Sequence, residues 1–405
     1  MHVAIAGAGI GGMTLASLLD RMGHDVTLVE KADAFAEVGA GIQISPNGSR
    51  ILAAIGLADD LARIGTMPER IVMRRWEDDA ELLARPQGHL PIERYGHPYY
   101  NVYRPDLVDI LAEAVAGVTT RFGAEVVGAR NLGGGAALDL ADGTVIEADV
   151  VVGADGIHSR VRDAVFGASP SRFAGLVAYR ALVPRDLVAD LSIEVTNRMG
   201  PGRHIVSYFV GEGQRHFNLV CVVPEAAWDV EGWNEPGSVE DLRAHFAGWS
   251  PAVHRILDLV DEPVYRWALH DRPPMERWVD GRVALLGDSC HAMLPFMAQG
   301  ACQAIEDGAI LSWLLTEAAP DVVVGRCDRV DVALERYRRI RRPRAAEIQT
   351  RSWKNATTFH LPDGPEQRRR DRILAAGNVD DGSDPLQWLH GYDALTIDLE
   401  PTSAD

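Results

Sequence analysis

The sequence predicts an α/β fold in which a parallel sheet is followed by an antiparallel sheet and then by a helical C-terminal segment. Three observations support this prediction. Residues 2–29 read as strand, glycine-rich turn, helix and strand, which is the order of a βαβ unit. Residues 175–223 change to longer strands with alternating apolar positions, typical of a sheet with one covered face. Residues 330–353 have a strongly helical pattern and are rich in arginine.

The glycine-rich turn has the spacing of a dinucleotide-binding fingerprint. Residues 7–12 read Gly-Ala-Gly-Ile-Gly-Gly, directly after an apolar strand and at the start of a helix. Gly7 permits the tight turn, Gly9 lets the backbone approach a pyrophosphate, and Gly12, next to Gly11, lets the helix pack closely on the strand. The helix N-terminus then offers free N–H groups to the phosphates. The alternative is a tight turn with a structural role only.

An acidic residue follows at the position where such units bind ribose. Glu30 ends the second strand, 30 − 12 = 18 residues after the last glycine. A carboxylate there accepts hydrogen bonds from ribose hydroxyls and repels a 2′-phosphate. The fingerprint therefore favours FAD or NAD over NADP in this site.

The overall composition excludes several classes of partner. The chain has 405 residues, with 40 Lys and Arg against 58 Asp and Glu, for a formal net charge of −18. An acidic chain repels phosphate backbones, so no nucleic-acid partner is expected. No basic segment precedes the first strand, and no apolar run reaches the ~20 residues that a membrane helix needs. We expect a cytoplasmic protein without a membrane partner.

The cysteines give no sign of a disulfide framework or a metal site. Cys221, Cys290, Cys302 and Cys327 are scattered and form no CxxC pair, which is typical of a reducing compartment. Cys290 is followed by His291, but no second pair of ligands stands at a metal-binding spacing. We therefore predict no metal ion.

Two later motifs decide between the nucleotides in favour of FAD. Residues 150–156 and 283–295 each begin with a buried strand that leads into a Gly and an Asp, Asp155 in the first and Asp288 in the second. A carboxylate at such a strand end can accept hydrogen bonds from ribose or ribityl hydroxyls. The helix that starts at Gly300 would point its positive end at the flavin ring. The alternative for either aspartate is a helix N-cap.

Together the three motifs resemble the group A flavoprotein monooxygenases of the para-hydroxybenzoate hydroxylase type. The resemblance runs from residue 2 to about residue 393. Residues 39–47, 103–107 and 297–307 are most similar to the group of salicylate hydroxylase, 3-hydroxybenzoate 6-hydroxylase and 6-hydroxynicotinate 3-monooxygenase. The fold that this resemblance implies is a Rossmann-like FAD-binding domain interleaved with an antiparallel-sheet substrate domain and followed by a C-terminal helical segment.

The resemblance also implies domain limits and cofactor contacts. We expect a discontinuous FAD-binding domain of residues 1–70, 100–172 and 276–345, a substrate domain of residues 71–99 and 173–275, and a C-terminal segment of residues 346–405. Besides the fingerprint glycines and Asp155, the motif positions imply FAD contacts from Glu30, Lys31, Gly41, Gln43, Arg104, Asp288, Pro295, Gly300 and Ala301.

The chemistry that the resemblance implies is hydroxylation of an activated ring. NADH or NADPH reduces FAD, dioxygen forms a C4a-hydroperoxyflavin, and an electrophilic OH passes to a ring whose own hydroxyl ionises. Such a site needs a proton acceptor. On the strand of residues 204–208, period-two alternation puts His204 and Tyr208 on one face, about 13 Å apart at ~3.3 Å per residue. The resemblance makes both of them substrate or proton-relay residues. The alternative is an ordinary wet strand face.

Two glutamines and one histidine refine this prediction. Gln299 lies in a loop where the 3-hydroxybenzoate enzyme is similar and has its Gln near the substrate; the alternative is a loop-stabilising amide. Gln43 stands where the 6-hydroxynicotinate enzyme carries a catalytic His. A Gln does not titrate, so this departure favours a phenolic carboxylate. His291 is expected to be structural or a flavin neighbour.

We therefore predict an FAD-dependent monooxygenase that uses NAD(P)H and O₂ to hydroxylate a small hydroxylated aromatic or heteroaromatic acid. Decarboxylation would accompany attack on the carboxylate-bearing carbon. The rivals are a flavin monooxygenase of a non-aromatic or polyketide-like substrate and a flavin-bound redox sensor without turnover. The chain is expected to be a monomer or a homodimer.

Overall fold

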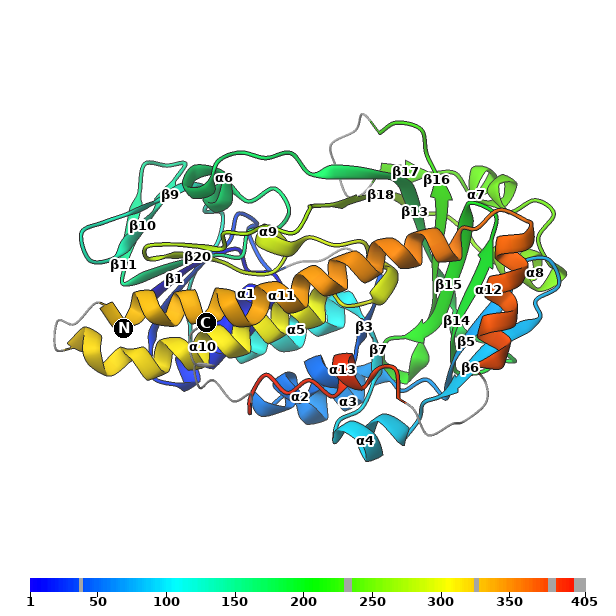
Figure 1. The fold of residues 1–405 in the computed structure, drawn as a ribbon, viewed down its shortest axis with the longest axis horizontal. Helices are drawn as coiled ribbons and strands as arrows, with labels where there is room; N and C mark the ends of the chain where they lie inside the picture. Colours follow the sequence, from blue (N-terminus) through cyan, green and yellow to red (C-terminus); the bar gives the residue numbers. More distant parts are fainter. Residues whose placement is uncertain (36–38, 229–234, 324–327, 378–383, 397–405) are drawn as a thin grey trace.

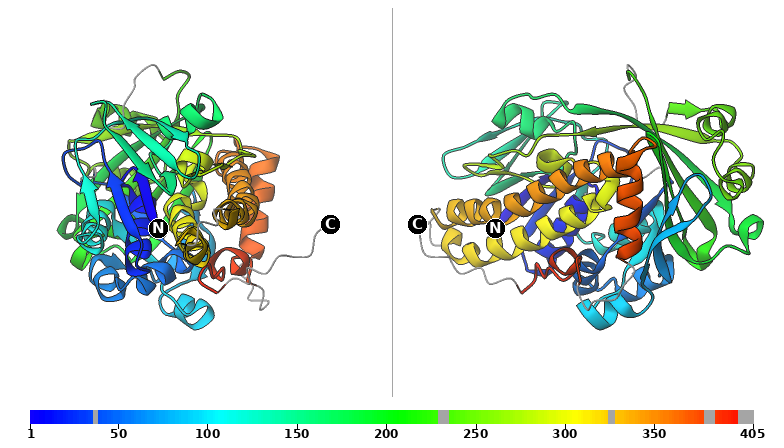
Figure 2. Two further views of the ribbon diagram at one scale, coloured as in Figure 1. Left: turned by 90° about the vertical axis from the view of Figure 1, so that its left-hand side faces the viewer. Right: turned by 45° about the vertical axis from the view of Figure 1, so that its right-hand side comes forward.

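A computed structural model of the chain describes residues 1–35, 39–228, 235–323, 328–377 and 384–396. Two large sheets dominate it and lie toward opposite ends of the elongated molecule (Figure 1). The first holds the N-terminal strand, and the second is the twisted antiparallel sheet at the far end (Figure 2). The predicted α/β class with a helical C-terminal part is confirmed.

The first sheet has six strands in the order β19-β20-β12-β1-β2-β8 and is parallel except at β19. In that order they are Val279–Asp280, Val283–Leu285, Val150–Gly153, His2–Ala6, Asp25–Val29 and Thr119–Arg121. The central strand β1 is almost wholly apolar because helices cover the sheet. Helix α1 (Ile10–Arg21) contacts both α5 (Arg104–Ala114) and α10 (Gly300–Val323). The βαβ unit read from residues 2–29 is therefore present.

The second sheet has eight strands in the order β17-β18-β13-β16-β15-β14-β5-β6. They are Glu235–Gly237, Val264–Asp271, Arg172–Pro184, His216–Pro224, Arg203–Val210, Glu194–Gly200, Arg70–Arg75 and Glu81–Pro86. Every neighbouring pair is antiparallel except β14 with β5. One face packs on α7 (Val239–His245) and α8 (Pro251–Leu257) through the apolar cluster around Phe209 and Phe246. We propose that this sheet is the core of the substrate domain.

Smaller elements lie around the two sheets and between their strands. One three-stranded sheet joins β11 (Val145–Ala148), β10 (Ala136–Leu140) and β9 (Val126–Asn131), and another joins β3 (Gly41–Ile44), β7 (Tyr100–Tyr103) and β4 (Gly65–Thr66). The short helices are α2 (Pro46–Ala54), α3 (Ala58–Ile64), α4 (Leu90–Tyr95), α6 (Arg160–Phe166) and α9 (Asp288–His291). Three 3₁₀ turns, η1 (Arg185–Val188), η2 (Glu212–Gln214) and η3 (Pro295–Met297), complete the connections.

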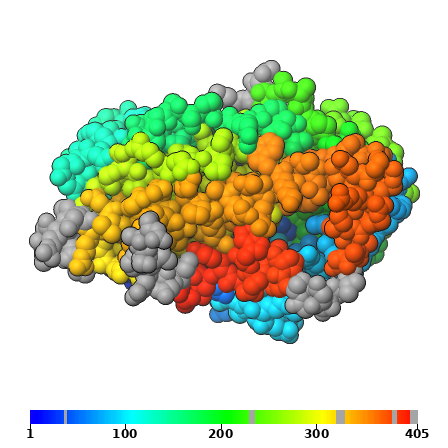
Figure 3. Space-filling view, viewed as in Figure 1, coloured from blue at the N-terminus to red at the C-terminus, as the bar shows by residue number. Residues whose placement is uncertain are grey.

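The C-terminal part ties the two ends of the molecule together. Helix α11 (Asp328–Phe359) runs along α10 from the end that holds the first sheet to the end that holds the second (Figure 1). Helix α12 (Pro365–Ala376) then contacts β6. The segment with α13 (Gln387–His390) lies against α11 on the face drawn in Figure 3. Among the described residues, the helices all fall short of the length and apolarity needed to cross a membrane.

Candidate active site

A cavity of about 540 Å³ is lined by residues from both sheets. This volume lies within the range of roughly 300–1,000 Å³ that is common for small-molecule sites. One part of its wall comes from the fingerprint turn, β3 and the loop before α10, and another comes from six strands of the eight-stranded sheet. We call these the nucleotide wall and the sheet wall. Residues of α11 and α13 close the space between them.

The fingerprint turn forms the nucleotide wall with its backbone. Gly7 has φ +99°, and a Cβ there would lie 2.5 Å from the carbonyl oxygen of Ala154. A Cβ on Gly12 would lie 2.0 Å from the carbonyl oxygen of Gly7, so only glycine lets α1 pack so closely. Gly9 caps α1, and a Cβ added there would meet no protein atom within 4 Å. The turn is therefore a cradle that leaves space in front of a helix N-terminus, as a pyrophosphate requires.

Glu30 stabilises the same turn. Its Oε2 accepts a hydrogen bond from the backbone N–H of Ala8 at 2.9 Å, and its Oε1 accepts one from Ala32 at 2.9 Å. Each carboxylate oxygen can accept a further bond, so these contacts leave Glu30 able to bind a ribose hydroxyl. Lys31 is exposed beside it.

The two motif aspartates behave differently. Asp155 accepts hydrogen bonds from Ser159 Oγ at 2.5 Å, and from the N–H groups of Arg160 and Val161 at 2.7 Å and 3.1 Å. These bonds stabilise the start of α6, and Asp155 does not line the cavity, although Gly156 does. This geometry supports the helix-capping alternative for Asp155. Asp288 lines the cavity, and its removal from bulk water raises the pKa of its carboxyl group.

The other predicted cofactor residues lie around the nucleotide wall. Gly41, Gln43, Arg104, Pro295, Gly300 and Ala301 all line the cavity. Gly300 and Ala301 begin α10, so the positive end of a 24-residue helix faces this space. Gly41 lies where the two walls meet, since a Cβ on it would stand 2.6 Å from Tyr208 Cε2.

Strand register arranges the side chains of the sheet wall in rows. His204 and Tyr208 on β15 both line the cavity, as the alternation predicts, with Val206 between them. Val206 pairs with Val220 on β16, which pairs in turn with Arg180 on β13. On its other side Val206 pairs with Asn197 on β14. Directly paired residues point to the same face of a sheet. Arg180, Val220, Val206 and Asn197 therefore form one row across four strands, and this row passes between His204 and Tyr208.

Arg180 brings a positive charge to this wall. It lies two strands from Val206, about 10 Å away at ~4.8 Å per strand. Its Cζ is 4.8 Å from the centroid of the Trp267 ring, and its Nε is buried without a hydrogen-bond partner among the described residues. Burial lowers the pKa of Arg180, but a guanidinium stays protonated in proteins. Arg180 is therefore a cation that faces the cavity without a carboxylate partner in the described part of the chain.

Tyr208 presents its hydroxyl to the same cavity. The side chain is 4% exposed and makes no hydrogen bond to a residue that the structure describes. Burial raises its pKa to about 12, although the charge of Arg180 acts in the opposite direction. The tyrosine therefore stays protonated near neutral pH and can donate a hydrogen bond to a ligand.

His204 is paired with a second histidine. Its Nδ1 lies 2.7 Å from Nε2 of His360, which directly follows α11. The rings of Phe296 and Phe359 stand edge-on to His204, with centroids 5.3 Å and 5.4 Å away. Burial lowers the pKa of His204 well below its usual value, so the ring is neutral near neutral pH.

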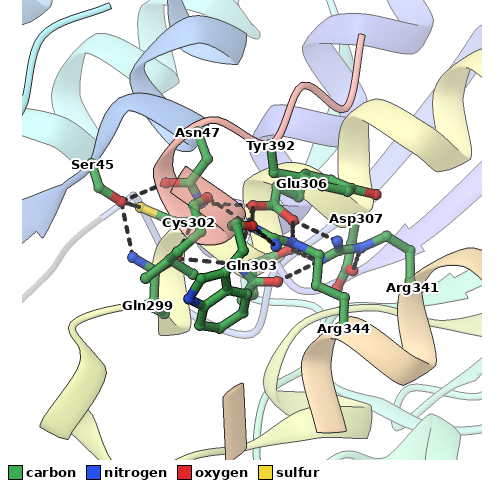
Figure 4. A network of polar contacts seen from close by, with 12 residues as sticks. Ser45, Asn47, Gln299, Cys302, Gln303, Glu306, Asp307, Arg341, Arg344 and Tyr392 are labelled. Atoms are coloured by element: carbon green, nitrogen blue, oxygen red, sulfur yellow. Dashed lines mark hydrogen bonds and ion pairs between the residues drawn. The ribbon is translucent and has the colours of Figure 1, made fainter. Parts of the chain in front are cut away.

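Gln299 belongs to a buried polar network (Figure 4). Its Nε2 donates to Ser45 Oγ at 2.9 Å, and its Oε1 accepts from Asn47 at 3.0 Å. Asn47 also donates to Glu306, which pairs with Arg341 and Arg344. Gln299 also lines the cavity, and these hydrogen bonds support a loop-stabilising amide, the role that we propose for it.

The same network includes His291. Its Nε2 lies 2.6 Å from Asp307 Oδ2, and Arg341 Nε lies 2.7 Å from Asp307 Oδ1. Burial alone would raise the pKa of Asp307, but His291 and Arg341 outweigh it and lower this pKa to about 2. Cys290 is close enough to complete a three-residue cluster that could hold a metal ion. Because Arg341 already balances the carboxylate, we infer a structural role for this cluster.

The cradle, the helix ends and the buried polar side chains fit an enzyme with a nucleotide cofactor, and comparison with known proteins gives the family. The family described as FAD binding domain matches residues 1–352. A 3-amino-4-hydroxybenzoate 2-monooxygenase of Streptomyces platensis is 42% identical over 400 residues, which cover 98% of this chain and 97% of that protein. A 6-hydroxynicotinate 3-monooxygenase of Bordetella bronchiseptica is 36% identical over 367 residues, covering 90% and 94%.

A solved structure agrees with these relatives. HpxO of Klebsiella pneumoniae, complexed with FAD and uric acid, has a TM-score of 0.81 and 28% sequence identity, and the match covers 93% of each chain. The chain therefore belongs to the FAD binding domain family and is an FAD-dependent monooxygenase. A nicotinamide co-substrate is typical of this family.

Sequence reasoning missed Arg180 and Asn197, which line the cavity, and His360, which contacts the cavity residue His204. The alternation along β13 could have placed Arg180 on one face of its strand, but not beside the row of His204 and Tyr208. His360 lies 156 residues from His204 along the chain, so no local sequence pattern predicts their contact. The segment with α13 also lines the cavity through Leu386, Leu389 and His390. Arg344 holds it by donating to the carbonyls of Trp388 and Leu389.

Proposed function

We propose that this monooxygenase hydroxylates a small aromatic carboxylic acid that carries a ring hydroxyl. One observation carries the proposal: Arg180, His204 and Tyr208 surround an apolar patch of Val206 and Val220 on the sheet wall. A flat ring fits an apolar patch, a guanidinium suits a carboxylate, and the Tyr and His suit a phenolic hydroxyl.

The nucleotide wall fits FAD. We propose that Gly9, Gly11 and Gly12 hold the pyrophosphate, that Glu30 and Lys31 lie at the ribose, and that Asp288 meets a hydroxyl of the ribityl chain. The remaining contacts that we propose are Gly7, Gly41, Gln43, Arg104, Pro295, Gly300 and Ala301. Bound FAD, reduced by NADH or NADPH, supplies an oxygen atom derived from O₂ in electrophilic form.

The side chains of the sheet wall prepare the ring for attack. Tyr208 donates a hydrogen bond to the ring hydroxyl and so stabilises its oxygen as charge develops there. His204 is neutral, so its free ring nitrogen, Nε2, can accept the hydroxyl proton. Loss of that proton makes the ring electron-rich, and the apolar patch keeps water from the reacting carbon.

Relatives suggest which acid to test first. The relative at 42% identity is named for 3-amino-4-hydroxybenzoate, an aromatic acid with a ring hydroxyl. Gln43 donates to Asn101 Oδ1 at 3.2 Å and provides no titrating group, which continues to favour a phenolic acid over a hydroxypyridine. We also propose a cytoplasmic monomer or homodimer, in keeping with the buried free thiols of Cys221, Cys290 and Cys302.

The proposal is tested by a panel of hydroxybenzoates, hydroxypyridine carboxylates and polycyclic phenols, with 3-amino-4-hydroxybenzoate as the first compound. The measurements are stimulated NAD(P)H oxidation and hydroxylated product. We expect Tyr208→Phe to keep FAD and substrate binding while hydroxylation falls about 100-fold, or to divert NAD(P)H oxidation to peroxide. Full coupling at the wild-type rate would exclude the role of Tyr208. Turnover of the polycyclic phenols alone would exclude the small acid.

A further inference from the structure

We propose that His360 is a positioning residue of the hydroxylation reaction and forms, with His204, a two-histidine path that carries the substrate's proton from the cavity to solvent. This inference rests on the proposed function, because it requires a ring hydroxyl that loses its proton at His204. It extends that function by stating how the proton leaves a buried site.

The contact between the two rings is the first support. His204 Nδ1 and His360 Nε2 are 2.7 Å apart, with ring centroids 4.9 Å apart and an interplanar angle of 35°. At this distance one nitrogen donates and the other accepts. In the tautomer where His204 donates, its Nε2 is a free acceptor, since no described residue bonds to it.

Burial is the second support. His204 is 2% exposed, and Phe296 stands edge-on to both histidine rings. His360 is only partly buried, and its carbonyl oxygen accepts a hydrogen bond from Gly202 in the turn between β14 and β15 at 3.1 Å. The pair therefore leads from the cavity past the aromatic rings of Phe296 and Phe359 to the turn between β14 and β15. Among the described residues, His360 is the one hydrogen-bond partner through which His204 can pass a proton.

The environment favours a relay over storage of charge. A buried imidazolium would be costly, and burial also lowers the pKa of His360, to about 4. If His204 gives up its Nδ1 proton while it receives one at Nε2, it never becomes a buried cation. The second histidine therefore makes a neutral, buried His204 usable as a base.

The proton balance closes without any redox partner. The O–H bond of the ring hydroxyl breaks and an N–H bond forms at His204 Nε2. The Nδ1–H bond of His204 breaks and an N–H bond forms at His360 Nε2. His360 then releases its Nδ1 proton to water. Return of a proton by the same route to the phenolate of the product restores both tautomers.

The test uses the FAD-loaded full chain and the panel compound that the wild type hydroxylates fastest. In His360→Ala we expect FAD content and KM to stay unchanged while the hydroxylation rate falls about tenfold, a fraction of the roughly 10²–10⁴ that proton transfer contributes. Added imidazole should restore the rate, because it can occupy the vacated space and carry the proton. His270→Ala is the control, since His270 is a half-buried histidine that bonds to Ser171 and does not line the cavity.

Several outcomes separate the possibilities. A wild-type rate in His360→Ala overturns the relay, and so does a slow variant that imidazole does not restore. Where the alanine variant does not fold, His360→Gln decides: it keeps a hydrogen-bonding side chain but passes no proton, so a wild-type rate overturns the proposal and a tenfold loss supports it. A wild-type protein that hydroxylates no panel compound overturns the proposed function and, with it, the relay.

Discussion

The two walls of the cavity are made by different means. The nucleotide wall offers mostly backbone, with Gly9 open to the cavity and the N-terminal turn of α10 facing it. The sheet wall offers side chains, because alternation along five-residue stretches and register across strands select which groups point inward. A backbone wall depends on a short contiguous motif, whereas a side-chain wall depends on which strands become neighbours.

With the cofactor at the nucleotide wall and the substrate at the sheet wall, as we propose, this difference would let relatives share a cofactor and differ in substrate. A substitution in the nucleotide wall changes how closely two backbones approach, which few residues tolerate. A substitution in the sheet wall changes one side chain on a strand whose hydrogen bonds are made by the backbone. The cofactor site is therefore expected to be intolerant of change and the substrate site to be tunable. Four experiments can break or sharpen this contrast.

The largest loss of stability is expected from a substitution among the charges that are buried beneath the nucleotide wall. Arg341 is fully buried and pairs with Glu306 at 2.5 Å and with Asp307 at 2.7 Å. Arg341→Met removes the cation that pairs with both carboxylates, so that Glu306 is left with Arg344 and Asp307 with His291, and it should lower the free energy of unfolding by about 3–5 kcal/mol. Denaturant titration measures the change, and FAD should dissociate before the sheet wall unfolds.

The matched control lies on the same helix. Arg351 pairs with Glu347 at the surface of α11, and Arg351→Met should cost about 1 kcal/mol or less. Equal losses in the two variants would mean that the buried network does not support the nucleotide wall.

The next effect is a contrast between two glycines of one turn. Gly12→Ala places a methyl group 2.0 Å from the Gly7 oxygen and should lower the free energy of unfolding by about 1–3 kcal/mol while abolishing FAD binding. Gly9→Ala meets no protein atom, so the melting temperature of the apoprotein should stay unchanged while FAD affinity falls about tenfold, or 1.4 kcal/mol. Thermal melting and flavin absorbance measure both. Normal FAD affinity in Gly9→Ala would remove the cradle from the cofactor site.

Much of the fold and of the nucleotide wall was predictable from sequence, for a physical reason. The fingerprint turn is one contiguous segment, and its glycines are required by contacts close to a single βαβ unit. The same locality allowed His204 and Tyr208 to be placed on one strand face, because alternation needs only the chain itself. The family resemblance, carried by motifs in order along the chain, extended this to the interleaved fold and the FAD dependence.

The remainder depended on contacts between distant segments. Arg180 and Asn197 reach the central row only through the register of β13, β16, β15 and β14, which no single strand encodes. Besides the nearby Gln303, Gln299 bonds to the distant residues Ser45 and Asn47, so the local motif indicated its place but not these two bonds. Asp155 could not be assigned from sequence for a similar reason. The motifs of Asp155 and Asp288 look alike in sequence, but the carboxylate of Asp155 accepts hydrogen bonds from the N–H groups at the start of α6.

A moderate loss of substrate affinity is expected from a substitution on the sheet wall. Arg180→Gln removes the cation that we propose for the substrate carboxylate, and a charged hydrogen bond contributes about 1.5–3 kcal/mol, so KM for 3-amino-4-hydroxybenzoate should rise roughly 10- to 100-fold. FAD content and melting temperature should not change. The amide analogue 3-amino-4-hydroxybenzamide should lose little, because it carries no charge. Arg185→Gln is the control, since Arg185 stacks on Phe209 and does not line the cavity. An equal loss for acid and amide would exclude carboxylate recognition.

The smallest effect should come from Lys31, an exposed cation that we propose at the ribose of FAD. If backbone and helix ends hold the cofactor, an exposed ammonium adds little, because water and salt screen its charge. Lys31→Ala should therefore weaken FAD binding by about 1 kcal/mol or less, roughly fivefold, and this loss should vanish at high salt. Titration of the apoprotein with FAD at low and high ionic strength measures both. A loss beyond about 100-fold would contradict the contrast between the walls, because a side chain would then dominate where the glycines should.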